Sequence, residues 1–365
     1  MLLSEIIIQK IRKEGPISFH DFMEMALYYP ELGYYTSSTD KIGKNGDYYT
    51  SATLTPIFGA LLGKQLEEMW HLLGEDQFTI VEYGAGTGVL CKSILDFLKN
   101  NKKLYAGLNY CIIEKSPAMR RKQKEILSEK VSWHNSIQNI SGLTGCVLSN
   151  ELVDNFSVHQ VVMEDELKEV FVDHQNYFVE SLKPASEELK NYLAELRVEL
   201  PKGFRTEINL EATTWMKEIA THLHKGYVLT IDYGYPSGEL YCEQRKNGTL
   251  VCYNKHRVNY QPYVYIGEQD ITSHVNFSAL CLWGFKNGLQ YGGYTDQCNF
   301  LSALGFRDYL KKTEKPGHDY LNFKREMALT NTLLKDMGKK FKILVQQKEV
   351  PEQKLMGLRS NQIAA

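Results

Sequence analysis

The strongest hydrophobic pattern in the chain is a short apolar run that leads through a glycine-rich turn into a helical repeat. Phe78, Ile80 and Val81 are typical of a buried strand, whereas the apolar residues of 90–98 recur at helical spacing. The sequence E-Y-G-A-G-T-G at 82–88 joins the two. The pattern therefore predicts a strand, a tight turn and a helix.

Other apolar runs predict more strands of one sheet, separated by helical stretches. We expect these strands at 109–114, 146–149, 227–232, 289–294 and 341–346. Three of the runs end in a polar side chain or lead into one, namely Glu114, Asn150 and Asp232. Strands that alternate with helices are typical of a parallel sheet, so the predicted fold is a doubly wound, Rossmann-like α/β domain.

The remaining segments predict additions to this domain. The residues before the sheet are too many for a tail and are expected to form a helical extension. Two insertions are predicted, a meander of short strands at about 156–226 and an aromatic-rich segment at about 236–275. The predicted organisation is an extension at 1–75, the main domain at 76–350 and a frayed tail at 351–365.

Composition and charge exclude several functions. The net charge of −2, with 24% charged residues, gives no electrostatic footprint for nucleic acid or an anionic membrane. No stretch approaches the roughly 20 apolar residues of a membrane span. The seven cysteines form no C-x-x-C pair, which indicates reduced thiols, no structural zinc and a cytoplasmic location. The D-x-x-x-H pattern at 270–274 is expected on one helix face, with Asp270 as the helix cap. Its two side chains are too few ligands for a metal site, so no metal is expected.

Glycine spacing separates two classes of cofactor. Glycine lets the backbone approach a ligand closely, and the start of the next helix offers unpaired N–H groups. Gly84, Gly86 and Gly88 give G-x-G-x-G, with Val89 where the third glycine of the dinucleotide pattern would fall. Preceded by Glu82, this resembles motif I of class I S-adenosylmethionine (SAM) methyltransferases, in which the carboxylate lies near the cofactor's methionine amine. A glycine-rich turn without a ligand is the alternative.

A carboxylate at the end of the second strand supports the same class of ligand. Glu114 follows Gly88 by 26 residues, close to the interval of about 20 residues found in dinucleotide folds. A carboxylate there can accept hydrogen bonds from both ribose hydroxyls. An exposed surface acid is the alternative interpretation.

Polar residues after the strand expected at 146–149 are the best catalytic candidates. Ligands of doubly wound folds lie beyond the carboxyl ends of the strands, so Asn150, Glu151 and Asp154 fall where a substrate meets the cofactor's methyl group. A helix cap with acids in the first turn would explain the same residues. Glu207 is a further candidate carboxylate, and a solvated acid is an equal alternative.

Several short motifs follow one another along almost the whole chain. They are G-P-I-S at 15–18, Y-Y-P-E-L-G-Y-Y at 28–35, G-D-Y-Y-T-S at 46–51, E-Y-G-A-G-T-G at 82–88, E-K-S-P at 114–117, S-N-E-L-V-D-N at 149–155, I-D-Y-G-Y at 231–235, G-T-L at 248–250, H-R-V-N-Y-Q-P-Y at 256–263 and G-E-Q-D-I-T-S-H-V-N-F at 267–277. In identity and order they resemble the MidA family of SAM-dependent methyltransferases, whose mitochondrial member methylates an arginine of a respiratory complex I subunit.

The resemblance implies SAM as cofactor, S-adenosylhomocysteine as its product, and an arginine of a protein, such as a respiratory complex subunit, as the methyl acceptor. Residues expected to hold the cofactor are Glu82, Gly84, Ala85, Gly86, Gly88, Glu114, Lys115 and Asn150. The expected catalytic carboxylates, which would bind the guanidinium group, are Glu151, Asp154 and Glu207. Substrate contacts are expected from Asp47, Tyr48, Tyr49, Tyr233 and His256.

Two departures from the family pattern leave the acceptor open. Thr50-Ser-Ala-Thr53 stands where the family commonly has a proline and a glutamate, and Asn155 and Ser157 stand where it has a small residue and a proline. If the missing glutamate binds arginine, the acceptor differs here. The alternatives are methylation of another side chain or a small molecule, and an assembly factor that binds SAM without turnover. No nucleic acid partner is expected, and a homodimer is left open.

Overall fold

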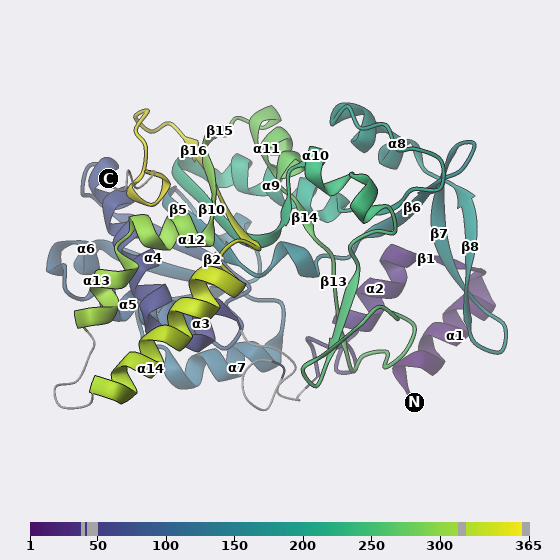
Figure 1. Ribbon diagram of the computed structural model, residues 1–365, viewed down its shortest axis with the longest axis horizontal. Coiled ribbons are helices and arrows are strands. Elements are labelled where there is room, and N and C mark those ends of the chain that lie inside the picture. Colours follow the sequence, from purple (N-terminus) through teal and green to yellow (C-terminus); the bar gives the residue numbers. More distant parts are fainter. Residues whose placement is uncertain (38–40, 42–49, 313–318, 360–365) are drawn as a thin grey trace. The chain divides into compact units, whose positions relative to one another are not determined.

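The computed structural model describes residues 1–37, 41, 50–312 and 319–359 (Figure 1). The chain divides into two compact units, each assembled from three separate segments. Unit 1 comprises residues 1–48, 153–216 and 234–283, and unit 2 comprises residues 49–152, 217–233 and 284–365. Each unit therefore joins segments that are distant in the sequence.

A mixed sheet is the framework of unit 2. Its strands are β2 (Phe78–Tyr83), β3 (Leu108–Ile113), β4 (Val131–His134), β5 (Leu143–Asn150), β10 (Leu223–Tyr235), β15 (Gln290–Asp296) and β16 (Phe341–Lys348). They lie in the order β15-β16-β10-β5-β2-β3-β4, and β14 (Val275–Asn276) pairs with the end of β10. The strands from β4 to β10 in this order are parallel, and β16 is antiparallel to both neighbours. The predicted doubly wound α/β fold is confirmed, because strand addition reverses direction between β2 and β5.

Helices cover this sheet with their apolar faces. Those of unit 2 are α3 (Ser51–Leu54), α4 (Pro56–Leu72), α5 (Val89–Leu98), α6 (Lys102–Gly107), α7 (Pro117–Ile126), α12 (Gln297–Ala303), α13 (Phe306–Lys312) and α14 (Asp319–Thr330), with the short 3-10 helices η1 (Ile137–Asn139) and η5 (Met356–Leu358) and the π-helix η4 (Asn331–Asp336). α4 and α5 lie side by side (Figure 1). They approach closely because Gly59 lacks a side chain: a Cβ there would lie 2.4 Å from Cβ of Ser93. Their apolar residues form one core with buried residues of the sheet such as Ile80 and Leu148.

Unit 1 contains two antiparallel sheets. The first consists of β1 (Ile17–Ser18), β6 (His159–Met163), β7 (Leu167–His174), β8 (Phe178–Pro184) and β9 (Arg205–Ile208), and the second of β11 (Val251–Asn254), β12 (Arg257–Asn259) and β13 (Asp270–Thr272). The helices are α1 (Leu3–Glu14), α2 (Phe19–Tyr28), α8 (Glu187–Glu195) and α10 (Ser237–Leu240), with turns η2 (Val153–Asn155) and η3 (Glu243–Arg245). α9 (Leu210–His222) and α11 (Phe277–Lys286) include residues of both units. The short strands predicted in the first insertion are confirmed by β6 to β8.

Two local expectations are wrong. Asp270 does not begin a helix that continues to His274, because residues 270–272 pair with β11 as strand β13. The tail does not fray throughout, because Leu355 and Leu358 are buried in the core of unit 2. Both errors arise from contacts between residues far apart in the sequence, which local patterns do not report.

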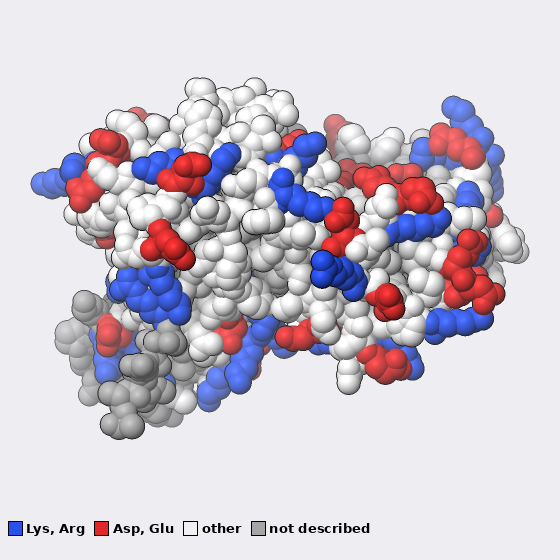
Figure 2. All heavy atoms as spheres, turned by 90° about the horizontal axis from the view of Figure 1, so that it is seen from above, with Lys and Arg blue, Asp and Glu red and all other residues white. Residues whose placement is uncertain are grey.

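Charged residues of both signs are mixed on the face shown in Figure 2. Over the described residues in this view, Lys and Arg side chains lie among Asp and Glu side chains. Some oppositely charged pairs are one helical turn apart, such as Lys92 and Asp96, whose N–O distance is 2.7 Å. This mixture agrees with the net charge of −2.

Candidate functional site

A glycine loop joins β2 to α5 in unit 2. Gly84, Gly86 and Gly88 have φ angles of 63°, 53° and 82°, which residues other than glycine rarely adopt. The N–H of Gly84 donates to the carbonyl of Ile113 at 2.9 Å, which attaches the loop to the neighbouring strand. Ala85 lies buried between the glycines, and its carbonyl accepts from the N–H of Gly88 at 2.8 Å. The backbone therefore forms the surface of the loop, as a close-fitting ligand requires.

Glu82 precedes this loop as a buried acid with one tyrosine partner. Its carboxylate accepts a hydrogen bond from the hydroxyl of Tyr110 at 2.7 Å, and the residue is 2% exposed. Burial raises the pKa of Glu82 to about 7, the hydroxyl of Tyr110 opposes this rise, and the charge of Glu114 adds to it. Glu82 thus changes its charge near neutral pH.

Glu114 lies at the end of β3 and is connected to the glycine loop. Its carboxylate accepts from the N–H of Ser116 at 2.9 Å and from the side-chain amide of Gln123 at 3.0 Å. Burial raises its pKa, and these donors oppose the rise. Gln123 also donates to the carbonyl of Gly86 at 2.9 Å, so a single side chain holds both the loop and the acid. Lys115, the next residue, is exposed.

Glu151 follows β5 in a left-handed conformation, with φ of 52°. Its N–H donates to the carbonyl of Ile231 at 2.9 Å. One carboxylate oxygen accepts from the N–H of Ser51 at 3.1 Å and from the side-chain amide of Asn150 at 3.3 Å. Burial raises the pKa of Glu151 to about 8, and the charge of Asp232 contributes to the rise. The acid at this edge is therefore mostly protonated at pH 7.

The other predicted residues are distributed over both units. Tyr233 in unit 2 lies two residues before the end of β10. Its ring contacts that of Phe341 edge-on, with the ring centroids 5.6 Å apart. Asp47, Tyr48 and Tyr49 lie outside the described residues.

Unit 1 contains the other three predicted residues, Asp154, Glu207 and His256. Of the three predicted catalytic carboxylates, unit 2 therefore contains only Glu151. Asp154 is buried and accepts from the side chain of Asn155 at 2.9 Å. Glu207 is buried and accepts from the N–H and the hydroxyl of Thr249 at 2.8 and 2.9 Å. His256 is exposed in the turn between β11 and β12.

Asp232 and Tyr110 were missed as site residues, although each stands in a predicted strand. Asp232 is fully buried, and its carboxylate accepts from the N–H groups of Leu152 and Tyr233 at 3.1 and 2.9 Å. The available signal for Asp232 was its position at the carboxyl end of a strand. For Tyr110 it was the two-residue alternation of strand side chains, which predicts no particular partner across the sheet.

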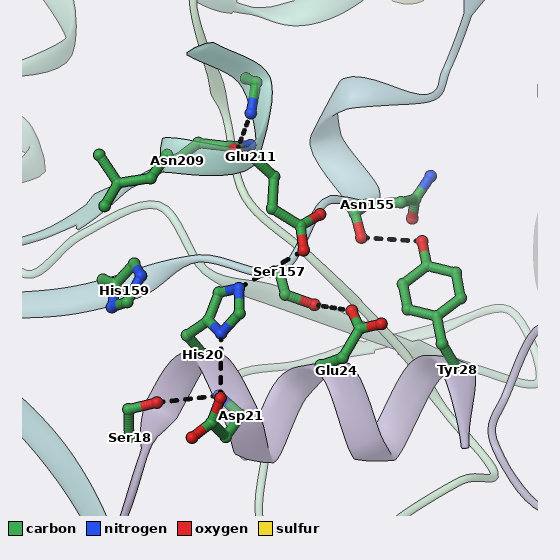
Figure 3. A network of polar contacts seen from close by, with 12 residues as sticks. Ser18, His20, Asp21, Glu24, Tyr28, Asn155, Ser157, His159, Asn209 and Glu211 are labelled. Atoms are coloured by element: carbon green, nitrogen blue, oxygen red, sulfur yellow. Dashed lines mark hydrogen bonds and ion pairs between the residues drawn. The ribbon is translucent and has the colours of Figure 1, made fainter. Parts of the chain in front are cut away.

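A second polar cluster lies within unit 1 (Figure 3). His20 faces Asp21 and Glu211, with N–O distances of 3.3 and 3.4 Å. Hydrogen bonds to these acids raise the pKa of His20 to about 9. Its ring stacks on His159 with centroids 4.7 Å apart, and His159 bonds Glu169 at 2.7 Å. All of these residues except Glu211 line a cavity of about 490 Å³. Sequence reasoning gave no sign of the cluster, because its members come from four separate segments.

The residues present fit an adenosyl cofactor at the carboxyl edge of β2, β3 and β5. The glycine loop supplies the backbone cradle, and Glu114 keeps lone pairs available because a carboxylate accepts about four hydrogen bonds. Among the described residues, no group hydrogen-bonds the buried side-chain oxygen of Asn150, so this atom can accept from a ligand. No cluster of three His, Cys, Asp or Glu side chains within the described ranges could hold a metal ion.

The known proteins to which the chain is similar include named methyltransferases. Residues 61–295 match the family described as "Putative S-adenosyl-L-methionine-dependent methyltransferase". The Drosophila melanogaster protein named protein arginine methyltransferase NDUFAF7 homolog, mitochondrial, is 28% identical over 76% of this chain and 69% of that protein. The Caenorhabditis elegans protein of the same name is 25% identical over 93% of this chain and 85% of that protein.

Two solved structures from Burkholderia thailandensis share the fold over nearly the whole chain. A COG1565 superfamily member bound to S-adenosyl-homocysteine has a TM-score of 0.88 and 30% identity, covering 97% of this chain and 94% of that one. A native structure of a COG1565 superfamily protein has a TM-score of 0.86 and 29% identity, covering 98% of this chain and 94% of that one. The family match and the S-adenosyl-homocysteine in the first structure confirm SAM as the predicted cofactor.

The cytoplasmic location predicted from the cysteines is wrong. The relatives from Drosophila melanogaster, Caenorhabditis elegans and Danio rerio are all named as mitochondrial proteins, which points to mitochondria. Free cysteines indicate only a reducing environment, and this does not distinguish one reducing compartment from another.

In the part of the chain that the structure describes, no helix combines the length and apolar character needed to cross a bilayer. The matched region begins within α4 and extends through the glycine loop, both acids Glu114 and Glu151, and most of β15. Because it covers more than half of the residues, the chain belongs to this family of S-adenosyl-L-methionine-dependent methyltransferases.

Proposed function

We propose that this enzyme transfers the methyl group of SAM to a guanidinium nitrogen of an arginine in a protein substrate. The observation that carries the acceptor assignment is the carboxyl of Glu151, half-buried at the carboxyl edge of β5 with a raised pKa. That edge is where ligands of doubly wound folds lie. The relatives named protein arginine methyltransferases support the same acceptor.

Cofactor binding belongs to the edge formed by β2 and β3. Glu114 would accept from the ribose hydroxyls, Glu82 would face the methionine amine, and the glycine loop would pack against the nucleoside. The sulfonium of SAM supplies an activated methyl group, so the protein's own contribution is alignment and the exclusion of water. Lys115 and the side-chain oxygen of Asn150 are the remaining proposed cofactor contacts.

Glu151 would prepare the acceptor. A guanidinium group has a pKa of about 12.5 to 13.8 and a delocalised charge, so its nitrogens are poor nucleophiles. Ionised Glu151 can accept from two of its N–H groups, which concentrates positive charge on that side and leaves electron density on the far nitrogen. Entry of the cation would favour the ionised form of Glu151, because opposite charges lower a carboxyl pKa.

Asp154 and Glu207 stay proposed as assisting carboxylates, although both already accept hydrogen bonds within unit 1. Rim contacts to the substrate are proposed for Tyr233 and His256, and for the segment 47–49. Transfer to another side chain or a small molecule would use the same cofactor edge, so the acceptor must be identified by experiment.

The test uses labelled SAM, the purified enzyme and a protein extract from cells that lack this chain. Wild type should label protein, and acid hydrolysis should release the label as methylarginine. Glu151→Gln should lose labelling while keeping affinity for S-adenosylhomocysteine, whereas Glu125→Gln, an exposed acid on α7, should behave as wild type. Label in another amino acid, or full activity of Glu151→Gln, would reject the proposal.

A further inference from the structure

Asp232 joins the ends of β10 and β5 in unit 2. These strands are parallel neighbours, with Asn150 opposite Ile231 in the register. One carboxylate oxygen of Asp232 accepts from the N–H of Leu152 at 3.1 Å, and the other accepts from the N–H of Tyr233 at 2.9 Å. The side chain thus binds a backbone N–H within β10 and one just beyond the end of β5.

Glu151 immediately precedes Leu152, the residue held by the first of these contacts. Its φ of 52° is unfavourable for a residue with a side chain, so neighbouring bonds must maintain the conformation. The bond from the N–H of Glu151 to the carbonyl of Ile231 fixes one side, and the bond from Leu152 to Asp232 fixes the other. Asp232 is fully buried, so water does not compete for its carboxylate oxygens.

Leu152 extends the connection to the cofactor loop. A Cβ placed on Gly84 would lie only 2.6 Å from Cδ1 of Leu152, so the leucine side chain packs directly on the glycine. Holding the N–H of Leu152 therefore sets the side chain of Glu151 and the contact with the cofactor loop together.

We infer that Asp232 is the positioning residue of the acceptor site, because its carboxylate ties the N–H of Leu152, immediately after Glu151, to the strand whose Ile231 carbonyl holds the N–H of Glu151 itself. This assignment rests on the proposed function, since it treats Glu151 as the residue that meets the acceptor. Asp232 itself is buried under its backbone contacts and is not expected to touch the substrate.

The electrostatic consequence has a definite sign. Among the described residues, the groups that face the carboxyl of Glu151 include the N–H of Ser51 on α3, the side-chain amide of Asn150 on β5 and the carboxylate of Asp232 on β10. The two amide donors lower the pKa of Glu151, whereas burial and the charge of Asp232 raise it. Removing that charge should therefore lower the pKa of Glu151, which a role limited to stability would not do.

The test is a carboxyl titration of the full chain with ¹³C-labelled glutamate, followed by NMR. Glu151→Gln identifies the signal, and wild type should titrate near pH 8, as the pKa of about 8 requires. Asp232→Asn keeps a side-chain oxygen for the N–H of Leu152 and removes the charge, so the midpoint should fall by about half a pH unit or more. Asp96→Asn, an exposed acid on α5, is the control and should leave the midpoint unchanged.

A second variant keeps the charge and moves the oxygens. Asp232→Glu should leave the midpoint high but reduce methyl transfer at least about tenfold, since small displacements of an aligned group cost that much. An unchanged midpoint in folded Asp232→Asn, or full transfer by Asp232→Glu, would overturn the assignment. The titration needs no acceptor, so a failure of the arginine proposal, seen as an active Glu151→Gln, is distinguishable from a failure here.

Discussion

Replacing Tyr110 with phenylalanine should make cofactor affinity depend more strongly on pH. The substitution removes one hydroxyl, which donates to Glu82 at 2.7 Å inside the sheet. Both residues are buried, at 1% and 2% exposure, so water does not replace the lost donor. The hydroxyl stabilises the ionised form of Glu82, and its loss must raise the pKa of that carboxyl.

The size of the effect follows from the free energy that the hydrogen bond between Tyr110 and Glu82 contributes. A bond to a charged group contributes about 1.5–3 kcal/mol, and 1.36 kcal/mol corresponds to one pH unit, so the pKa of Glu82 should rise by about one to two pH units. Starting from a pKa of about 7, roughly three quarters of the wild-type carboxyl is ionised at pH 7.5. In Tyr110→Phe only about 3–25% would be ionised, so affinity should fall about 3- to 25-fold if Glu82 binds the methionine amine as a carboxylate.

Calorimetric titration with S-adenosylhomocysteine at pH 7.5 and pH 9.5 measures this directly. The ratio of wild-type to variant affinity should fall nearly to one at pH 9.5, because Glu82 is then mostly ionised in both proteins. Ionisation of the ligand itself affects both affinities equally and cancels in the ratio. Tyr105→Phe on α6, which leaves Glu82 untouched, should match wild type at both values. Equal affinities at pH 7.5, or a loss that persists at pH 9.5, would refute the reasoning.

Three further predictions concern the two units separately. Gly84→Ala should weaken S-adenosylhomocysteine binding about tenfold, because φ of 63° is strained and the new Cβ meets Leu152 at 2.6 Å; calorimetry on the folded variant decides this. Gly248→Ala should destabilise the chain by about 2 kcal/mol or more, because φ is 85° and the Cβ would lie 2.3 Å from Glu207; an unchanged urea midpoint would contradict it. The favourable contribution of His20 should be complete below its unfolded pKa near 6.5 and lost as pH rises through about 9. His20→Gln should therefore lower Tm clearly at pH 6.5 and hardly at pH 10, and equal losses at both values would contradict the assignment.

The sheet of unit 2 could be predicted because its strands are local signals. The apolar runs at 78–83 and 108–113, and the glycines between strand and helix, report their own conformation without help from distant residues. The strand at 270–272 could not be recognised, because its conformation depends on pairing with β11 about twenty residues earlier. The burial of Leu355 depends in the same way on a core assembled from several segments.

The sequence predicted those residues of the candidate site that lie at the carboxyl ends of strands. Glu82, Glu114 and Glu151 were identified because each lies at or just beyond the carboxyl end of a strand, at the edge where ligands lie. The hydrogen-bond partners that influence the charge of these acids were not identified. Tyr110 reaches Glu82 only because of the register of the sheet, and Ser51 reaches Glu151 only because of the position of α3. A residue's pKa depends on such partners and on burial, neither of which the sequence displays.

The most direct test of the account compares S-adenosylhomocysteine binding to Glu114→Gln and Glu151→Gln by calorimetry at pH 7.5. Wild type should bind at one site, and Glu114→Gln should bind about 10- to 100-fold more weakly, because it loses a charged acceptor for the ribose hydroxyls. Glu151→Gln should bind as wild type does. Absence of heat with the folded wild-type chain, or a loss confined to Glu151→Gln, would contradict the assignment of the β2 and β3 edge to the cofactor.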